Sequence, residues 1–279
     1  MNNTLYSIFK KGSKTYFYSS IFFPKKVKED VFTLYSFVRT ADDFVDSVPQ
    51  QKKGFIQFKK NYEKAIQGKR SGDLVIDGFC GLCRRMDFRR EWIRLFLKAM
   101  EMDLFKKRYF TLAETKEYMV GSAEVIGLMM ARIMGLPDRS FSRARLLGRS
   151  MQYINFIRDI REDRSLGRTY LPLAELKKAG LKSLEYQDII REPEKFRKFI
   201  QSQLDIYSRW QKEAEKGYRY IPKRYLVPVK TASEMYQWTA ETIRKDPFVV
   251  FRKKVKPPFM LILYHVIRNM LGGWNVSRP

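Results

Sequence analysis

Two short acidic segments interrupt an otherwise basic chain, and their residue types and spacing are suited to binding metal cations. We call residues 35–46 the first acidic segment and residues 152–163 the second acidic segment. Each has three carboxylates within five residues: Asp42, Asp43 and Asp46 in the first, and Asp159, Glu162 and Asp163 in the second.

The spacing would place several oxygen ligands on one face of each helix. Asp42 and Asp46 are four residues apart, and the same interval separates Asn155, Asp159 and Asp163. Because residues three and four apart share one face of a helix, each segment would form a row of oxygen ligands. Two such rows facing one another could hold several hard cations.

The helices that carry these segments are expected to be buried. Apolar residues cover most of the circumference of the first helix: Val31, Phe32, Leu34, Tyr35, Phe37, Val38, Ala41, Phe44 and Val45. They also surround the second: Met151, Tyr153, Ile154, Phe156, Ile157 and Ile160. A helix that is apolar on nearly all sides lies inside the protein, where an unpaired charge costs free energy. The carboxylates therefore need a metal ion, a cationic partner or a water-filled cavity.

Either segment alone is explained as well by ordinary surface charge. Asp is usually exposed, and Arg158 with Glu162 has the spacing of an ion pair along a helix. Two such segments, both on apolar helices, favour a site for a divalent metal.

The ligand types indicate which metal and which substrate class to expect. Oxygen ligands favour Mg²⁺, Ca²⁺ or Mn²⁺, and Mg²⁺ completes its shell with water and substrate phosphate. Arg39, Arg158 and Arg168 lie beside the carboxylates in the sequence and suit a diphosphate or triphosphate. The sequence contains no nucleotide-binding glycine motif. We therefore expect a diphosphate whose other end is apolar, which describes a prenyl diphosphate.

Helical periodicity extends over nearly the whole chain. Apolar residues recur at spacings of three and four in these segments: 28–46, 54–67, 90–105, 112–134, 141–163, 194–217 and 231–245. Breaks between them contain Gly and Pro, and convincing alternating strands are absent. No repeat or long linker divides the sequence, so we predict one all-α domain over residues 1–279.

Composition limits the class of protein and its partners. Hydrophobic content of 44% with 15% aromatic residues excludes a disordered chain, and two cysteines, Cys80 and Cys83, give no disulfide framework. The net charge of +25 suggests an anionic partner: nucleic acid, lipid headgroups or a phosphorylated substrate.

The start of the sequence lacks the apolar core of a signal peptide, and the longest apolar stretch, 259–267, is too short to span a bilayer. We expect a cytoplasmic protein.

The two segments together resemble the signatures of the squalene/phytoene synthases, which join two prenyl diphosphates head to head. The first signature is Tyr35-x3-Arg39-x2-Asp42-Asp43-x2-Asp46. The second is Gln152-x2-Asn155-x2-Arg158-Asp159-x2-Glu162-Asp163, followed by Gly167-Arg168-Thr-Tyr170-Leu-Pro172. The resemblance runs from Gly12 to the region of Lys254. It implies the all-α isoprenoid synthase fold (class I terpenoid synthase), a helical bundle around a central cavity across which two aspartate-rich helices bind diphosphates through Mg²⁺.

The resemblance also implies roles for individual residues. The implied metal ligands are Asp42, Asp46, Asn155, Asp159 and Asp163. The other implied groups at the reacting diphosphate and cation are Tyr35, Arg39, Gln152 and Tyr236. The implied substrate-binding residues are Ser13, Lys14, Asp43, Arg158, Arg168, Arg252, Lys253 and Lys254. Mn²⁺ can replace Mg²⁺ in such a site, and NADPH is implied only for a squalene synthase.

One stretch departs from the family pattern. Val120 stands where the family commonly has a pocket tyrosine, and Glu124 stands where it has a glycine. Valine cannot hydrogen-bond a diphosphate or steer a proton, so the second half of the reaction and the product are left open by these positions.

Several functions remain as alternatives at this point. Condensation of two geranylgeranyl diphosphates to phytoene is the leading hypothesis, and farnesyl diphosphate giving dehydrosqualene or squalene is its nearest rival. A basic helical nucleic-acid-binding protein is supported by net charge alone, so no nucleic acid is expected. The basic surface better fits an anionic membrane at the inner face of which the protein would lie. Residues 257–274 could form the membrane contact or a buried terminal helix, and the oligomeric state is not indicated.

Overall fold

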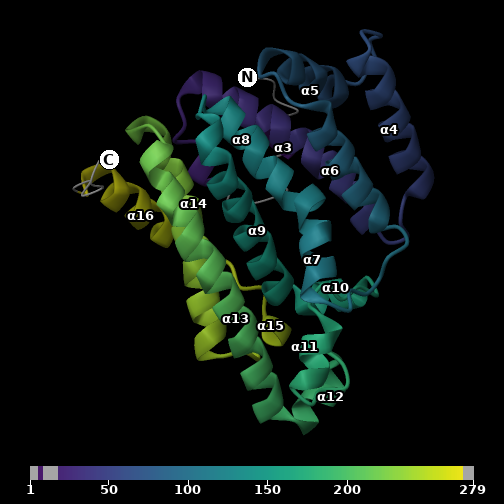
Figure 1. Ribbon diagram of the computed structural model, residues 1–279, viewed down its shortest axis with the longest axis vertical. Coiled ribbons are helices and arrows are strands. Elements are labelled where there is room, and N and C mark those ends of the chain that lie inside the picture. The colour runs from purple at the N-terminus through teal and green to yellow at the C-terminus, as the bar shows by residue number, and fades with distance from the viewer. Residues whose placement is uncertain (1–5, 9–17, 273–279) are drawn as a thin grey trace.

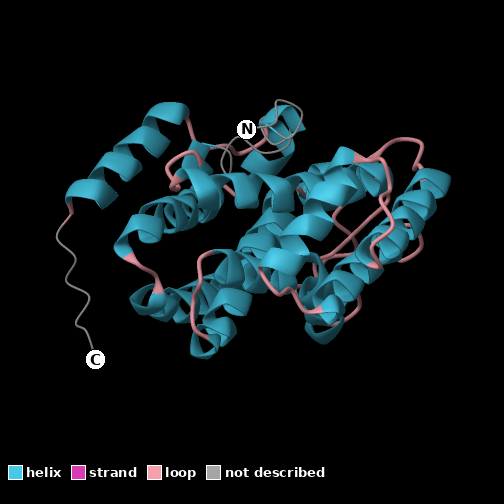
Figure 2. Ribbon diagram, turned by 90° about the horizontal axis from the view of Figure 1, so that it is seen from above, coloured by secondary structure: helices cyan, strands magenta, loops and turns pink. Residues whose placement is uncertain are grey.

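The computed structural model describes residues 6–8 and 18–272, and these residues form helices joined by loops (Figure 1). The main helices before the second acidic segment are α3 (Lys25–Asp46), α4 (Lys52–Ile66), α5 (Leu74–Arg85), α6 (Arg90–Met102), α7 (Leu112–Met119) and α8 (Val125–Ile133). Those that carry or follow it are α9 (Phe141–Arg158), α10 (Ile160–Ser165), α11 (Leu173–Lys178), α12 (Tyr186–Arg191), α13 (Pro193–Glu215), α14 (Lys223–Lys245), α15 (Val249–Arg252) and α16 (Phe259–Leu271). Shorter turns of helix are η1 (Val120–Glu124), η2 (Asp138–Ser140) and η3 (Lys216–Tyr220). The described part of the chain contains no strand (Figure 2), so the all-α prediction is confirmed.

Two segments predicted as continuous helices are interrupted. In the predicted helix 112–134, a π-helical turn, η1, separates α7 from α8. In the predicted helix 141–163, α9 ends at Arg158 and α10 begins at Ile160. The residue between them, Asp159, has φ −98° and ψ 18°, outside the α-helical region. Both interruptions lie in helices that the sequence associates with the site.

Helix α9 lies at the centre of the bundle, with α8 and α13 packed against it (Figure 1). Glycines allow the close approach of α8 and α9. A Cβ at Gly127 would lie 2.2 Å from the backbone oxygen of Ala144, and one at Gly148 would lie 2.4 Å from that of Ala123. Only residues without a side chain fit such a crossing, so these glycines fix how closely α9 approaches its neighbour.

Local sequence signals account for several helix boundaries. The side chain of Asp73 accepts hydrogen bonds from the backbone N–H groups of Val75 and Ile76 and so caps α5. Thr111 caps α7 by accepting a hydrogen bond from the backbone N–H of Glu114, and Pro193 occupies the first turn of α13.

Cys80 and Cys83 are buried in the core as free thiols. Among the helices described, none combines the length and apolar character that crossing a membrane requires.

Candidate active site

The first acidic segment forms the last turns of α3. Arg39 holds two of its carboxylates: Nη1 lies 2.7 Å from Asp42 Oδ2, and Nη2 lies 2.5 Å from Asp43 Oδ1. Tyr35 lies one turn earlier on the same helix. Burial raises the pKa of Tyr35 above its usual value, and the nearby Asp42 and Tyr236 add to the shift.

The second acidic segment keeps its helical register despite the break at Asp159. The N–H of Asp159 donates to the Asn155 carbonyl at 2.8 Å, and the N–H of Asp163 donates to the Asp159 carbonyl at 2.8 Å. Arg158 binds the Asp159 carboxylate with Nε and Nη2, at 2.8 and 2.5 Å. The predicted ion pair between Arg158 and Glu162 is wrong, because Glu162 pairs instead with Lys254. The adjacent carboxylate at the helix break attracts the Arg158 guanidinium more effectively than one a turn away.

Arg168 connects the two acidic segments. Its backbone N–H donates to the carbonyl of Asp163 at 2.8 Å, which ties it to the second segment. Its guanidinium contacts the first segment, with Nη1 2.5 Å from Asp46 Oδ1 and Nη2 2.6 Å from the carbonyl of Val45. The side chain is only 3% exposed, so this bridge is part of the interior and sets the two segments against one another.

The carboxylates of the two segments are close enough to repel one another. Burial and repulsion from Asp159 and Asp46 raise the pKa of Asp163 well above its usual range. Burial and repulsion from Asp46 raise the pKa of Asp42 to about 8, although Arg39 opposes the shift. Burial acts in the same direction on Asp159, but the Arg158 guanidinium outweighs it and lowers the pKa of that carboxyl. The site therefore has an excess of negative charge that a cation would relieve.

Asp103 belongs to this region although sequence reasoning missed it. It accepts hydrogen bonds from the hydroxyls of Tyr118 at 2.6 Å and Tyr170 at 2.7 Å. The Tyr170 hydroxyl also accepts from Arg168 Nη1 at 3.3 Å. Burial raises the pKa of Asp103 to about 6, with Arg168 opposing. No motif or spacing distinguishes Asp103 in the sequence, whereas Tyr170 lies in the stretch that follows the second signature.

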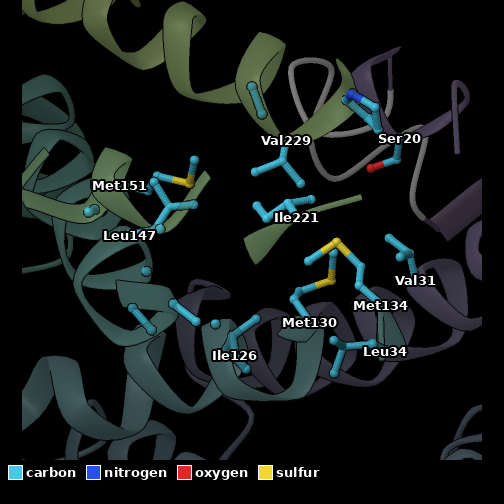
Figure 3. A pocket seen from close by; sticks show the side chains of 18 of the residues that line it. Ser20, Val31, Leu34, Ile126, Met130, Met134, Leu147, Met151, Ile221 and Val229 are labelled. Carbon is cyan, nitrogen blue, oxygen red and sulfur yellow. The ribbon is translucent and has the colours of Figure 1, made fainter. Parts of the chain in front are cut away.

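An apolar cavity of about 250 Å³ begins at the two segments. Tyr35, Gln152 and Asn155 line its polar part, and α8, α14 and the N-terminal halves of α3 and α9 supply apolar walls. Figure 3 shows side chains from these elements, from Met134 just after α8 and from Ile221 just before α14, pointing toward one open space: Val31, Leu34, Ile126, Met130, Met134, Leu147, Met151, Ile221 and Val229. The combination of a polar end beside the acidic segments and apolar walls suits a ligand with a charged head and a hydrocarbon tail.

The structure brings only part of the other predicted residues to this site. Lys254 Nζ lies 3.7 Å from Asp159 Oδ1. Arg252 pairs with Asp246 instead, and Lys253 is exposed to solvent. Tyr236 is buried in α14, near enough to Arg158 to contribute to the raised pKa of that guanidinium, although burial acts in the opposite direction. Ser13 and Lys14 lie outside the described residues.

Val120 and Glu124 occupy η1, but neither side chain is among the described groups that line the cavity. The Glu124 carboxylate is fully buried between two arginines. Its Oε2 lies 2.8 Å from Arg145 Nε, and its Oε1 lies 2.5 Å from Arg149 Nη2. The guanidinium of Arg149 also lies over the ring of Trp210. Glu124 therefore packs behind the cavity wall rather than facing the substrate space.

The residues present fit a hard divalent cation shared with a substrate. Within the described residues, no three His, Cys, Asp or Glu side chains are close enough to hold a metal ion by themselves. Mg²⁺ in proteins often uses only one or two carboxylates and takes its remaining ligands from phosphate and water. The buried Oδ1 of Asn155 has no hydrogen-bond partner in the part of the chain that is described. An unpaired oxygen beside Asp159 is a suitable additional ligand.

Comparisons with known proteins agree with this geometry. Residues 9–260 match the family described as squalene/phytoene synthase. The 15-cis-phytoene synthase of Paracoccus sp. (strain N81106 / MBIC 01143) is 26% identical over 96% of this chain and 89% of its own. The 15-cis-phytoene synthase of Pantoea ananas is 30% identical over 63% of this chain and 60% of its own.

Solved structures show the same fold. A dehydrosqualene synthase in complex with a ligand superposes with a TM-score of 0.87 at 22% identity, covering 96% of this chain and 94% of its own. The squalene synthase HpnC from Alicyclobacillus acidocaldarius superposes with a TM-score of 0.76 at 20% identity, covering 88% and 94%. The predicted isoprenoid synthase fold is therefore confirmed.

Proposed function

Because this chain belongs to the squalene/phytoene synthase family, whose members are prenyltransferases, we propose that it condenses two geranylgeranyl diphosphates head to head to give phytoene. The reaction would proceed through a cyclopropyl diphosphate and require Mg²⁺, which Mn²⁺ could replace. The observation that carries the proposal is the apolar cavity that ends at Tyr35, Gln152 and Asn155, beside two acidic segments joined by Arg168.

The proposed metal ligands are Asp42, Asp46, Asn155, Asp159 and Asp163. Bound Mg²⁺ would neutralise the charge that develops on the leaving diphosphate. This use of the carboxylates is supported by their mutual repulsion and by the Oδ1 of Asn155, which has no hydrogen-bond partner among the described residues.

The arginines of the site would bind and orient the diphosphate. A guanidinium has five N–H donors in a fixed geometry, so Arg39 and Arg158 can each hold a carboxylate and a phosphate oxygen at the same time. Arg168, which is buried and bound to Asp46 and Val45, would add positive charge behind them. Lys254, beside Asp159, adds positive charge at the same end. We place Asp43 with this group because it shares the Arg39 guanidinium with Asp42.

The cavity would protect the allylic cation that forms when the diphosphate leaves. Its walls are mainly hydrocarbon and include the aromatic rings of Phe23, Tyr35 and Tyr218. Aromatic faces stabilise a cation, and exclusion of water prevents its capture before the second prenyl chain reacts. Tyr236, buried near Arg158, would help to close the polar end.

A prenyl substrate also implies a location. Because such hydrocarbons partition into bilayers, we propose that the protein is cytoplasmic and lies against the anionic inner face of the membrane. The net charge of +25 supports an anionic partner surface.

The test incubates the purified protein with Mg²⁺ and either the C20 or the C15 diphosphate, with and without NADPH, and identifies the hydrocarbon. Phytoene from the C20 substrate without NADPH is the expected result. Dehydrosqualene from the C15 substrate would move the assignment to farnesyl diphosphate, and squalene formed only with NADPH would indicate a squalene synthase. No product from either substrate would contradict a prenyl-condensing enzyme.

A further inference from the structure

Helix α16 exposes a continuous apolar face. Six of its apolar side chains are between 47% and 80% exposed: Phe259, Met260, Tyr264, Ile267, Met270 and Leu271. Met260, Tyr264, Ile267 and Leu271 follow one another at intervals of four, three and four residues. This is the spacing of a single helix face. We call these six residues the α16 apolar face.

The opposite side of α16 is firmly attached to α14. Glu234 of α14 accepts hydrogen bonds from Asn269 at 2.7 Å and Arg268 at 2.6 Å and is 2.8 Å from His265 Nδ1. Ile262 and Val266 pack beside these contacts, on Met235 of α14. The helix lies at the periphery of the bundle (Figures 1 and 2). Its outward face is therefore displayed by a fixed helix.

The sequence around the α16 apolar face is entirely basic in its charged residues. Residues 247–272 contain no Asp or Glu and five cationic side chains, of which three pair with carboxylates elsewhere: Arg252 with Asp246, Lys254 with Glu162 and Arg268 with Glu234. Lys253 is exposed beside them, and the chain as a whole has a net charge of +25. An exposed apolar helix face on a strongly basic protein is complementary to anionic lipid headgroups.

The α16 apolar face is close to the cavity through two connections. The ring of Tyr18 contacts that of Phe259 at 4.9 Å between centroids, and the residues after Tyr18, Ser19 and Ser20, line the cavity. Helix α14 has Val229 on the cavity wall and packs against α16 through Met235. A hydrocarbon substrate at this face would be one helix layer away from the cavity.

We propose that the α16 apolar face is a docking surface for an anionic lipid bilayer. With 13 residues, α16 is about 20 Å long, which suits a helix lying in the plane of the headgroups better than one crossing the bilayer. This docking surface rests on the proposed function, because it is the prenyl substrates that would give the enzyme a reason to bind a membrane.

The test measures co-sedimentation of the full-length protein with vesicles of phosphatidylcholine and phosphatidylglycerol. The variant Met260→Glu/Leu271→Glu places charge on the two most exposed apolar residues of the face. We expect its partition coefficient to fall about tenfold or more, because charged side chains do not enter the acyl boundary. The matched control is Ile56→Glu/Ile190→Glu, which makes the same charge change on exposed apolar residues of α4 and α12 and should bind nearly as wild type.

Each other outcome contradicts the docking surface. Absence of binding by wild type would overturn it, and equal loss in both double variants would show a charge effect without a defined face. If the α16 variant binds vesicles normally but loses self-association in lipid-free sedimentation, the face contacts a second copy of the chain. Condensing activity assayed in detergent separates this result from the proposed function: an active variant that no longer binds vesicles supports both.

Discussion

At the scale of single residues, the site is a set of carboxylates distinguished by their cationic partners. Arg158 keeps the pKa of Asp159 low against the effect of burial, whereas burial and repulsion keep those of Asp42 and Asp163 high. The sequence predicted which carboxylates would gather, since helical spacing determines which residues share a face. The sequence did not predict which carboxylate each arginine binds, because a guanidinium pairs with the carboxylate that lies nearest in the folded structure. Arg158 pairs with Asp159 in this way.

Asp42→Asn should stabilise the metal-free protein while removing activity. Because burial raises the pKa of Asp42 from 3.8 to about 8, its carboxyl contributes stability below about pH 4 that is lost as the pH rises through about 8. Asparagine keeps the shape without this loss. We expect the melting temperature of the variant, relative to wild type, to be higher at pH 8.5 than at pH 5, by about 2 °C or more. Turnover should fall at least about a hundredfold.

The neighbouring carboxylate provides the control for this prediction. Asp43 contacts the same arginine at 2.5 Å but is largely exposed. Thermal unfolding of Asp43→Asn should show little difference from wild type between the two pH values, since exposed ion pairs contribute little. If the melting temperatures of the two variants change equally with pH, the pH-dependent loss of stability does not come from Asp42.

At the scale of elements, irregular turns of helix position the site. The sequence predicted the helices because their apolar periodicity is strong, as in 28–46, which the structure extends only to Lys25. It did not predict η1 or the break at Asp159. Periodicity averages over several turns, so one added residue or one non-helical torsion leaves almost no signal in it. π-Helical turns are frequent at functional sites, and η1 carries Ser122 and Ala123 of the cavity wall.

Glu124→Gln should destabilise the fold by about 2–3 kcal/mol. The substitution removes a fully buried carboxylate that pairs with both Arg145, which is partly exposed, and Arg149, which is largely buried, and it leaves the charge of Arg149 without its partner. Urea denaturation followed by circular dichroism measures the change. Because Glu124 packs behind the cavity wall, we expect the KM for prenyl diphosphate to rise more than kcat falls.

A second glutamate tests whether position or charge is responsible. Glu117 lies on the exposed side of α7, so Glu117→Gln removes the same charge without disturbing a buried pair. Its unfolding midpoint should match that of wild type. If both variants lose the same stability, the arginine cluster around Glu124 contributes nothing specific to η1.

At the scale of the whole molecule, the acidic segments and the apolar walls of the cavity follow one another along the same helices. The first acidic segment ends α3, the second runs from the last turns of α9 into α10, and both α3 and α9 run from the carboxylates back along the cavity. Val31 precedes Asp42 by eleven residues, or about 16 Å of helix. The sequence predicted an aromatic and aliphatic pocket from composition and family resemblance. It could not predict the cavity's extent, because α3, α8, α9 and α14 all contribute to its walls.

The length of this cavity should determine which prenyl diphosphate is used. Val31→Phe places a larger side chain on the wall far from the carboxylates, where Figure 3 shows Val31 near Met134. We expect the ratio of kcat/KM for C20 over C15 diphosphate to fall about tenfold, since a difference of roughly 1.4 kcal/mol in fit changes a rate ratio by that factor. Met134→Ala should shift the ratio in the opposite direction. Val75→Phe makes the same enlargement in α5, outside the cavity lining, and should leave the ratio unchanged. Equal changes in all three variants would mean that overall packing, rather than the space near Val31, controls the choice of substrate.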